Sequence, residues 1–192
     1  MSGGALCHRG TEDILTKRLK LRRYELTDAE QMFKNYAADA RVTRFLPWKP
    51  YENVEDVRAF LAMAIAEYSL ENQYHWTIEF GGESAGGIST ISIDEKNLSC
   101  EIGCCLGYDF WGKGIMSEAT LAMMDFLFNR VGMERIVAKH DEENPASGRV
   151  MQKCGMVYEG CLRSHYRRHD GTRSDSMVYG ILKKEFNGAP RR

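Results

Sequence analysis

The chain has 192 residues, a length that suits a single domain with a sizeable apolar core. Apolar residues make up 43% of the chain and charged residues 28%, which is typical of a soluble globular protein rather than a disordered or fibrous one. The formal net charge of −1 argues against nucleic acid or an anionic membrane as a partner, because both attract a basic surface.

The first part of the chain predicts a strand followed by two helices. Apolar residues alternate over residues 18–24, as they do in a short strand. Thr27 and Glu30 have the spacing of a capping box, and the apolar residues after them repeat at helical intervals. The segment Phe-Leu-Pro-Trp-Lys-Pro at residues 45–50 separates this helix from a second one, which Asn53 is expected to cap.

The rest of the chain predicts an antiparallel meander and then helices alternating with strands. Turn-forming residues such as Gly81-Gly82 separate the strands of the meander. The helix after them is almost entirely apolar, which implies burial on most sides, and Gly132 follows its last turn. We expect strands at residues 74–80, 85–93, 98–106, 134–140, 156–159 and 176–182, and helices at residues 117–128 and 145–154.

These elements occur in the order β-α-α-β-β-β-α-β-α-β-β. The order predicts an α/β (α+β) fold, in which a mixed, mostly antiparallel sheet of about seven strands carries helices on both faces. No internal repeat or linker divides the chain. We therefore expect one domain over residues 14–188, with flexible ends at residues 1–13 and 189–192.

The cysteines suggest neither a metal site nor a disulfide framework. Cys100 and Cys104 fall on one face of a predicted strand and Cys105 on the other, so they cannot converge on a metal ion. A chain of this size needs no disulfides, and small buried residues explain these cysteines better. The first residues lack the pattern of a signal peptide, and no run reaches the ~18 apolar residues of a membrane span. We expect a cytoplasmic protein without a metal or a membrane partner.

A glycine-rich turn links the predicted strand 98–106 to the apolar helix. Gly112 and Gly114 flank Lys113 just before the helix, where free backbone N–H groups and the helix dipole favour a bound phosphate. Two glycines alone could also make a tight turn and nothing more. The turn lacks the Lys-Ser/Thr of a P-loop and the third glycine of a dinucleotide fingerprint, so nucleoside triphosphate and NAD sites are disfavoured.

The turn, Trp-Gly-Lys-Gly-Ile-Met-Ser-Glu-Ala at residues 111–119, resembles the acetyl-CoA loop of the GNAT superfamily of N-acetyltransferases. Asp109 stands where the superfamily signature has Gln or Arg, but the variant is similar to the branch that includes ribosomal-protein alanine acetyltransferases. Further segments resemble that branch in order and spacing: Thr-Lys-Arg-Leu-Lys-Leu-Arg at residues 16–22, Phe-Leu-Pro-Trp at 45–48, Glu-Ile-Gly at 101–103 and Glu-Asn-Pro-Ala-Ser at 143–147. The resemblance covers residues 16–186.

The resemblance implies an acetyl-CoA-dependent N-acetyltransferase with a GNAT-like fold, whose fourth and fifth strands splay apart to admit the cofactor. Asn144 would bind the pantetheine arm, and it also has a structural explanation as the N-cap before Pro145. Backbone N–H groups at the splay would polarise the acetyl carbonyl. The implied cofactor-binding residues are Cys104, Cys105, Leu106, Trp111, Gly112, Lys113, Gly114, Ile115, Met116, Asn144 and Ser147.

Two residues are candidates for the chemistry. By resemblance, Glu101 occupies the strand position of a carboxylate that takes the amine proton; a solvated or ion-paired carboxylate is the alternative. Ser147 would lie near the thioester sulfur and donate a hydrogen bond to the departing thiolate. His75 and His140 are alternative bases or structural histidines. Because no cysteine has a histidine partner in its sequence context, we expect direct attack in a ternary complex rather than an acyl-enzyme.

The expected acceptor is an amine. The branch resemblance favours a protein N-terminal amine; the alternatives are a small amine (polyamine, amino acid or aminoglycoside) and a non-catalytic acetyl-CoA-binding sensor or scaffold. By resemblance and position, Trp48 and the residues around it are candidates for the acceptor groove. A basic loop at residues 163–173 could meet an acidic substrate or be solvated, and with Arg191 and Arg192 it suggests a nucleic-acid partner that the net charge opposes. Both a monomer and a homodimer are compatible with the sequence.

Overall fold

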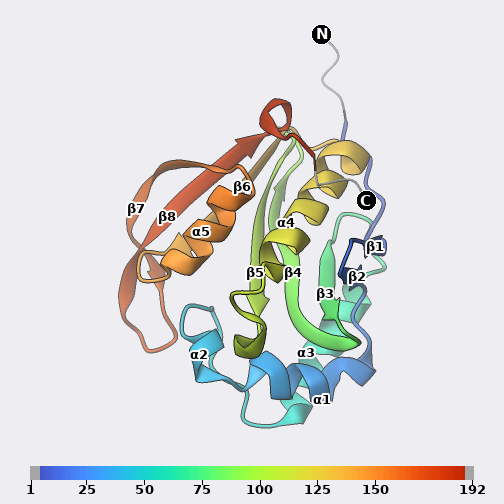
Figure 1. Ribbon diagram of the computed structural model, residues 1–192, viewed down its shortest axis with the longest axis vertical. Coiled ribbons are helices and arrows are strands. Elements are labelled where there is room, and N and C mark those ends of the chain that lie inside the picture. The colour runs from blue at the N-terminus through green and yellow to red at the C-terminus, as the bar shows by residue number, and fades with distance from the viewer. Residues whose placement is uncertain (1–4, 189–192) are drawn as a thin grey trace.

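The computed structural model describes residues 5–188, which form an eight-stranded sheet with helices on both faces (Figure 1). The predicted meander and strand-helix-strand units are both present, so the α/β fold class is confirmed. The strands are β1 Ile14–Leu15, β2 Leu19–Arg22, β3 His75–Phe80, β4 Glu83–Asp94, β5 Ser99–Leu106, β6 Arg135–Asp141, β7 Val157–Arg167 and β8 Arg173–Leu182. The helices are α1 Ala29–Met32, α2 Ala40–Thr43, α3 Val54–Glu67, α4 Ile115–Phe126 and α5 Pro145–Lys153.

Neighbouring strands follow the order β1-β2-β3-β4-β5-β6-β8-β7, and every pair is antiparallel except β5 with β6. Figure 1 shows α4 and α5 on the near face of the sheet, both beginning at the end where β5 finishes. The short helices α1 and α2 gather at that same end. The strand that the sequence did not predict is β1, whose two residues are too few to show alternation.

Each face of the sheet buries its own apolar cluster. The larger cluster lies between the sheet and the helices α4 and α5, and includes Trp76 and Phe126. The smaller cluster includes Tyr36 from the segment after α1 and Leu61 from α3. Helix α4 is buried along most of its length, as its nearly all-apolar sequence predicts.

Local hydrogen bonds set three helix ends where the sequence predicts them. The Asn53 side chain accepts the N–H of Asp56 at 3.0 Å at the start of α3. A π-helical turn continues α4, and Gly132 ends it with a φ of 94°. Pro145 is the first residue of α5, directly after its N-cap Asn144. These ends follow from capping chemistry that acts over a few residues.

The predicted capping box of Thr27 and Glu30 is wrong. The carboxylate of Asp28 accepts the N–H of Glu25 at 2.8 Å, and a 3₁₀ turn begins after Glu25. The reason is a contact from the preceding strand: Arg22 on β2 donates two hydrogen bonds to Asp28 and holds its carboxylate in this position. A tertiary ion pair therefore decides which of two possible caps forms.

The basic segment at residues 163–173 is a β-hairpin, not the expected loop. Strand β7 continues to Arg167 and β8 begins at Arg173, so the turn is confined to residues 168–172. Strand β7 forms the edge of the sheet, and nearly all of its side chains are exposed. Only its start was predicted, at residues 156–159, because neither face of β7 is buried and no apolar alternation marks the rest of the strand.

Residues 5–13, expected at a flexible end, lie against the body of the protein. The N–H of Cys7 donates to the carbonyl of Val131 at 2.8 Å. The indole of Trp76 donates to the carbonyl of Glu12 at 2.7 Å. Backbone hydrogen bonds of this kind hold a segment that has no regular structure of its own.

The predictions for residues 1–4 and 189–192, among them the basic Arg191 and Arg192, lie outside the described residues. Among residues 5–188, no helix is long and apolar enough to cross a membrane. The same residues contain no group of three or more His, Cys, Asp or Glu side chains placed to hold a metal ion.

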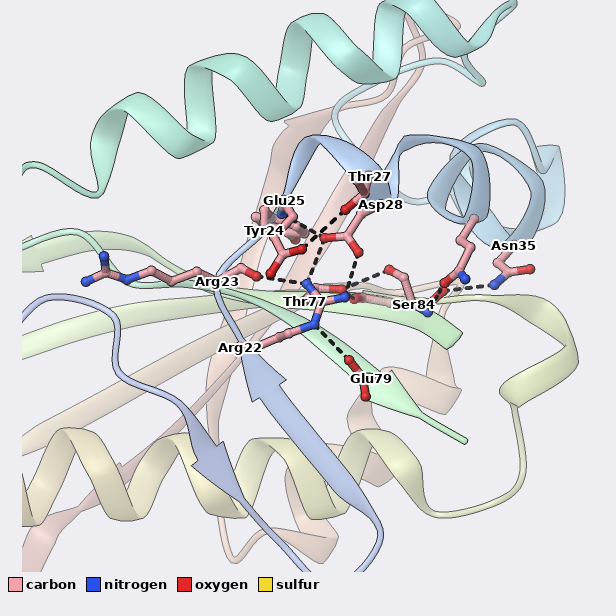
Figure 2. A network of polar contacts seen from close by, with 12 residues as sticks. Arg22, Arg23, Tyr24, Glu25, Thr27, Asp28, Asn35, Thr77, Glu79 and Ser84 are labelled. Atoms are coloured by element: carbon pink, nitrogen blue, oxygen red, sulfur yellow. Dashed lines mark hydrogen bonds and ion pairs between the residues drawn. The ribbon is translucent and has the colours of Figure 1, made fainter. Parts of the chain in front are cut away.

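An arginine with little solvent exposure joins the first strands to the helices of the far face (Figure 2). Arg22 on β2 donates to both carboxylate oxygens of Asp28, at 2.6 and 2.9 Å, and its Nε donates to Glu79 on β3 at 2.8 Å. Hydrogen bonding to Asp28 is the main cause that raises the pKa of Arg22. The Asp28 side chain is only 5% exposed, so removing its partner would leave a buried charge unpaired.

Replacement of Arg22 by alanine is expected to lower the free energy of unfolding by about 3 kcal/mol, because Asp28 would lose its counter-charge. Urea unfolding followed by circular dichroism measures the change. Arg9→Ala is the control, since Arg9 also pairs with a carboxylate, that of Glu12, but its side chain is 47% exposed and only a small effect is expected. Equal losses in the two variants would contradict the role given to Arg22.

Candidate active site

The parallel strands β5 and β6 separate toward their carboxyl ends. Their pairing ends at Ile102 with Ala138. Beyond that point, β5 stays paired with β4 as far as Leu106, and β6 stays paired with β8 as far as Asp141. Each strand is therefore held on its outer side, while the inner edge of residues 103–106 borders a gap.

A cavity of about 290 Å³ opens at this gap, a volume near the lower end for ligand pockets. The carboxyl end of β5, the turn before α4, the first turns of α4 and α5, and the α2 segment line it. Figure 1 shows that all of these elements meet at one end of the sheet. The predicted residues in the lining are Cys104, Cys105, Leu106, Trp111, Gly112, Gly114, Ile115, Met116, Asn144 and Ser147.

Two glycines shape the turn before α4. Gly112 and Gly114 both have a φ of 74°, a left-handed conformation that is costly for residues with a β-carbon. Helix α4 begins at Ile115, so the N–H groups of its first turn have no acceptor within the helix. The indole of Trp111 fastens the turn to β5, because it donates to the Leu106 carbonyl at 2.7 Å. The turn therefore combines left-handed glycines with free helix N–H groups, the features that anion-binding turns use.

A second, smaller cavity of about 60 Å³ adjoins the first. It lies between β5, β6, α4 and α5, and its lining includes the apolar side chains of Ile102 and Met151. Cys104 and Ser147 line both cavities, so the two meet at these residues. Ser147 is held there by the start of α5, where its N–H donates to the side-chain oxygen of Asn144 at 3.3 Å.

The cysteines at the cavity are poor nucleophiles. Cys104 has accessible surface in the cavity, but the surrounding protein desolvates its thiol and raises its pKa to about 12. Burial likewise raises the pKa of Cys105 to about 11. Because the thiolate and not the thiol attacks an acyl group, neither residue is suited to form an acyl-enzyme.

Two predicted site residues, Glu101 and Lys113, are not part of the lining of these two cavities. The carboxylate of Glu101 accepts a hydrogen bond from Lys139 Nζ at 2.8 Å. Lys139 itself lines the smaller cavity, so Glu101 contacts the site through it. The ammonium group of Lys113 lies 5.6 Å from the centre of the Phe110 ring.

The histidines considered as bases lie outside the lining of both cavities. The Nε2 atom of His75 is 2.8 Å from a carboxylate oxygen of Glu67. The Nδ1 atom of His140 donates to the carbonyl of Asp141 at 2.8 Å, and its ring packs against Gly148 in α5. These contacts favour structural roles.

Part of the lining was not predicted from the sequence. The α2 segment has no repeating pattern because α2 is a single turn. Of the group around Trp48, the structure places Phe45 and Leu46 in the lining of the larger cavity, but not Trp48 itself. The two cations on α5 are spaced four residues apart and follow Ser147, a signal that was visible in the sequence. The residues that line the larger cavity without having been predicted are Arg41, Val42, Phe110, Ser117, Ala146, Arg149, Val150 and Lys153.

Residues 18–157 match the family model described as an acetyltransferase (GNAT) domain. The chain belongs to the GNAT acetyltransferase family. The uncharacterized N-acetyltransferase p20 of Bacillus licheniformis is 33% identical over 180 residues, which are 92% of this chain and 99% of that protein. Spermidine N(1)-acetyltransferase of Escherichia coli K12 is 24% identical over 146 residues, which are 76% of this chain and 75% of that protein.

A solved structure gives a further likeness. RimL, a ribosomal L7/L12 alpha-N-protein acetyltransferase in complex with coenzyme A, is 25% identical, has a TM-score of 0.81 and matches over 89% of this chain and 98% of its own. GNAT acetyltransferases use acetyl-CoA, so this GNAT protein is an acetyl-CoA-dependent N-acetyltransferase. The predicted family, enzyme class and cofactor are thereby confirmed.

Gly114→Val is expected to weaken acetyl-CoA binding by this acetyltransferase more than about tenfold, because the new side chain would strain the left-handed turn at the start of α4. Isothermal titration calorimetry measures the dissociation constant. Gly81→Val is the matched control: Gly81 has a φ of 61° and open surroundings, but it lies in the turn between β3 and β4. Wild-type affinity in Gly114→Val would remove the phosphate-turn assignment.

Proposed function

We propose that this enzyme acetylates the N-terminal amine of a protein. The observation that carries the proposal is the charge of the site. Arg41 and Lys139 line the two cavities in addition to Arg149 and Lys153, which would meet the cofactor phosphates, and none of the described lining residues is acidic. A polyamine keeps several positive charges when it binds, and these would meet cations instead of carboxylates. A single terminal amine carries at most one charge, which it must lose before it reacts.

The names of the relatives cover both kinds of acceptor. RimL is named for a protein α-amine, whereas spermidine N(1)-acetyltransferase is named for a polyamine. Similarity alone therefore does not choose between them, and the basic lining of the cavities supports the protein amine.

The proposal assigns the parts of the site to parts of the cofactor. The N–H groups in the first turn of α4 would bind its pyrophosphate, and Arg149 and Lys153 would neutralise its phosphates. The inner edge of β5 would hydrogen-bond the amide groups of the pantetheine arm, as a sheet edge binds an added strand. The side-chain nitrogen of Asn144 can donate to the same arm, because its oxygen is used for capping. Bound acetyl-CoA supplies an activated acetyl group on sulfur.

The remaining groups serve acyl transfer. Backbone N–H groups next to Cys104 on the free edge of β5 would polarise the acetyl carbonyl where the two cavities meet. The Ser147 hydroxyl would donate to the sulfur as it leaves. The Glu101 side chain lies on the same face of β5 as Gly103. From there, its carboxylate would accept the amine proton through a water molecule.

An acceptor panel tests the proposed function. Acetyl-CoA turnover is measured with N-terminal peptides of ribosomal and other proteins, with spermidine and with aminoglycosides. We expect kcat/KM to be at least about tenfold higher for the best peptide than for spermidine, because the basic cavity disfavours a polycation. Selective turnover of spermidine would overturn the proposal. Tight acetyl-CoA binding without turnover of any acceptor would favour a sensor or scaffold.

Substitutions test the chemical roles. Glu101→Gln is expected to lower kcat about a hundredfold and Ser147→Ala about tenfold, with little change in acetyl-CoA affinity. Glu159→Gln is the control, because Glu159 is also a strand carboxylate in an ion pair, accepting from Arg135 Nη1 at 2.7 Å, but it lies on β7. Activity of Glu101→Gln equal to that of Glu159→Gln would exclude Glu101 as the base.

A further inference from the structure

We propose that Arg18 is a positioning residue that holds the phosphate turn in its cofactor-binding shape. The inference rests on the cofactor site proposed above. Arg18 lies in the turn between β1 and β2, far from the phosphate turn in sequence. Its Nη1 donates to the carbonyl of Lys113 at 2.9 Å, and its Nε donates to Glu118 in α4 at 2.7 Å. One guanidinium thus contacts both the turn and the helix that follows it.

The contact with the Lys113 carbonyl sets the direction of a peptide group. In a trans peptide, the C=O of one residue and the N–H of the next point in opposite directions. Gly114 lines the large cavity, whereas Lys113 is not part of that lining. Because Arg18 holds the Lys113 carbonyl away from the cavity, the N–H of Gly114 is left on the cavity side, where it can bind a phosphate.

Without this contact, the same peptide could rotate. Glycine adopts positive and negative φ almost equally well, so Gly112 and Gly114 give the turn little conformational preference of its own. A rotated peptide would present the Lys113 carbonyl oxygen to the cofactor phosphates in place of an N–H group. The two glycines let the cofactor phosphates approach the turn closely, but they leave the shape of the turn undetermined. A contact from outside the turn is therefore needed to fix it, and we call this contact by Arg18 the clamp.

Arg18 also neutralises a carboxylate beside the proposed anion site. Glu118 lies in the first turn of α4, where its charge would repel a bound phosphate. Burial alone would raise the pKa of Glu118, but hydrogen bonds from Thr16 and Arg18 outweigh it and hold the pKa below its usual range. The Thr16 hydroxyl donates to Glu118 at 2.6 Å, and the Arg18 N–H donates to it at 3.0 Å. The carboxylate is thus fully engaged by the β1–β2 turn.

The β1–β2 turn is itself well anchored. The N–H of Leu19 donates to the Thr16 hydroxyl oxygen at 2.9 Å, and the Thr16 N–H donates to the Leu19 carbonyl at 3.0 Å. Leu19 and Leu21 are buried in the larger core cluster. Arg18 therefore acts from a support that is already ordered before the cofactor binds, which lowers the entropic cost of fixing the turn.

Binding and turnover together test the clamp. We expect Arg18→Ala to weaken coenzyme A binding about tenfold by calorimetry, and to raise the KM for acetyl-CoA similarly with kcat nearly unchanged. The kcat/KM for acetyl-pantetheine, which lacks the pyrophosphate, should stay within about twofold of wild type. Unchanged coenzyme A affinity, or equal losses with the two donors, would overturn the proposal.

Arg58→Ala is the matched control. The Arg58 side chain is 39% exposed, as is that of Arg18, and it also bonds to a carboxylate, that of Glu55. Arg58 lies on α3, away from the cavity, and its loss should leave coenzyme A affinity unchanged. Arg18→Lys keeps the charge and most of the packing but cannot make both contacts, so a loss of at least about threefold is expected.

These measurements separate the clamp from the proposed cofactor site. If the wild-type protein fails to bind coenzyme A, the cofactor site itself is wrong. If wild type binds and Arg18→Ala and Arg18→Lys bind equally well, the cofactor site stands and only the clamp fails. Thermal unfolding of each variant checks that the fold is retained.

Discussion

The divergence of β5 and β6 is the constraint on which the site depends. Strand β5 keeps its antiparallel partner β4 to Leu106, and β6 keeps β8 to Asp141, so each strand is held from outside while the parallel pair opens. Backbone groups that a closed sheet would use internally are thereby left along the inner edge of β5. Helices α4 and α5 both begin beside this gap, and α4, which has no side-chain cap, adds the unpaired N–H groups of its first turn. The cavity is a consequence of strand pairing before any side chain is considered.

Residues 16–22 connect this gap to both layers of helices. At the beginning of the segment, Arg18 reaches the turn and the first residues of α4. At its end, Arg22 reaches Asp28 at the start of the helical segment on the other face, as Figure 2 shows. Buried Leu19 and Leu21 fix the strand between them. Residues 16–22 thus position the proposed phosphate-binding turn on one face of the sheet and the α1 segment on the other.

Features that depend on nearby residues could be predicted from the sequence, and features that depend on tertiary contacts could not. The turn at Gly112 and Gly114, the cap at Asn53 and the burial of α4 each follow from a short stretch of chain. The capping box at Thr27 failed because an ion pair from another strand selects Asp28. The length of β7 was missed as well: only residues 156–159 were expected, because its edge position removes the apolar alternation by which strands are recognised.

The candidate site also has parts that follow from a short stretch of sequence and parts that depend on tertiary contacts. Its glycine turn and the start of α5 are local motifs, and both contribute residues to the lining of one cavity. The contribution of the α2 segment arises only when the chain folds back over β5, so no pattern within residues 40–46 marks it. The environment of Glu101 is equally non-local, because the Lys139 that pairs with it belongs to the neighbouring parallel strand.

The basic lining also bears on how the proposed acceptor would lose its proton. An amine attacks only as the neutral base, and a nearby cation lowers the pKa of an ammonium group because it disfavours the charged form. Lys139 lines the small cavity at the place where the proposed acetyl group would lie. Glu101 is bonded to Lys139 at 2.8 Å, and in the proposed mechanism its carboxylate would accept the released proton. An enzyme whose acceptor is a cation in water can therefore use a basic cavity, provided that the acceptor carries a single amine.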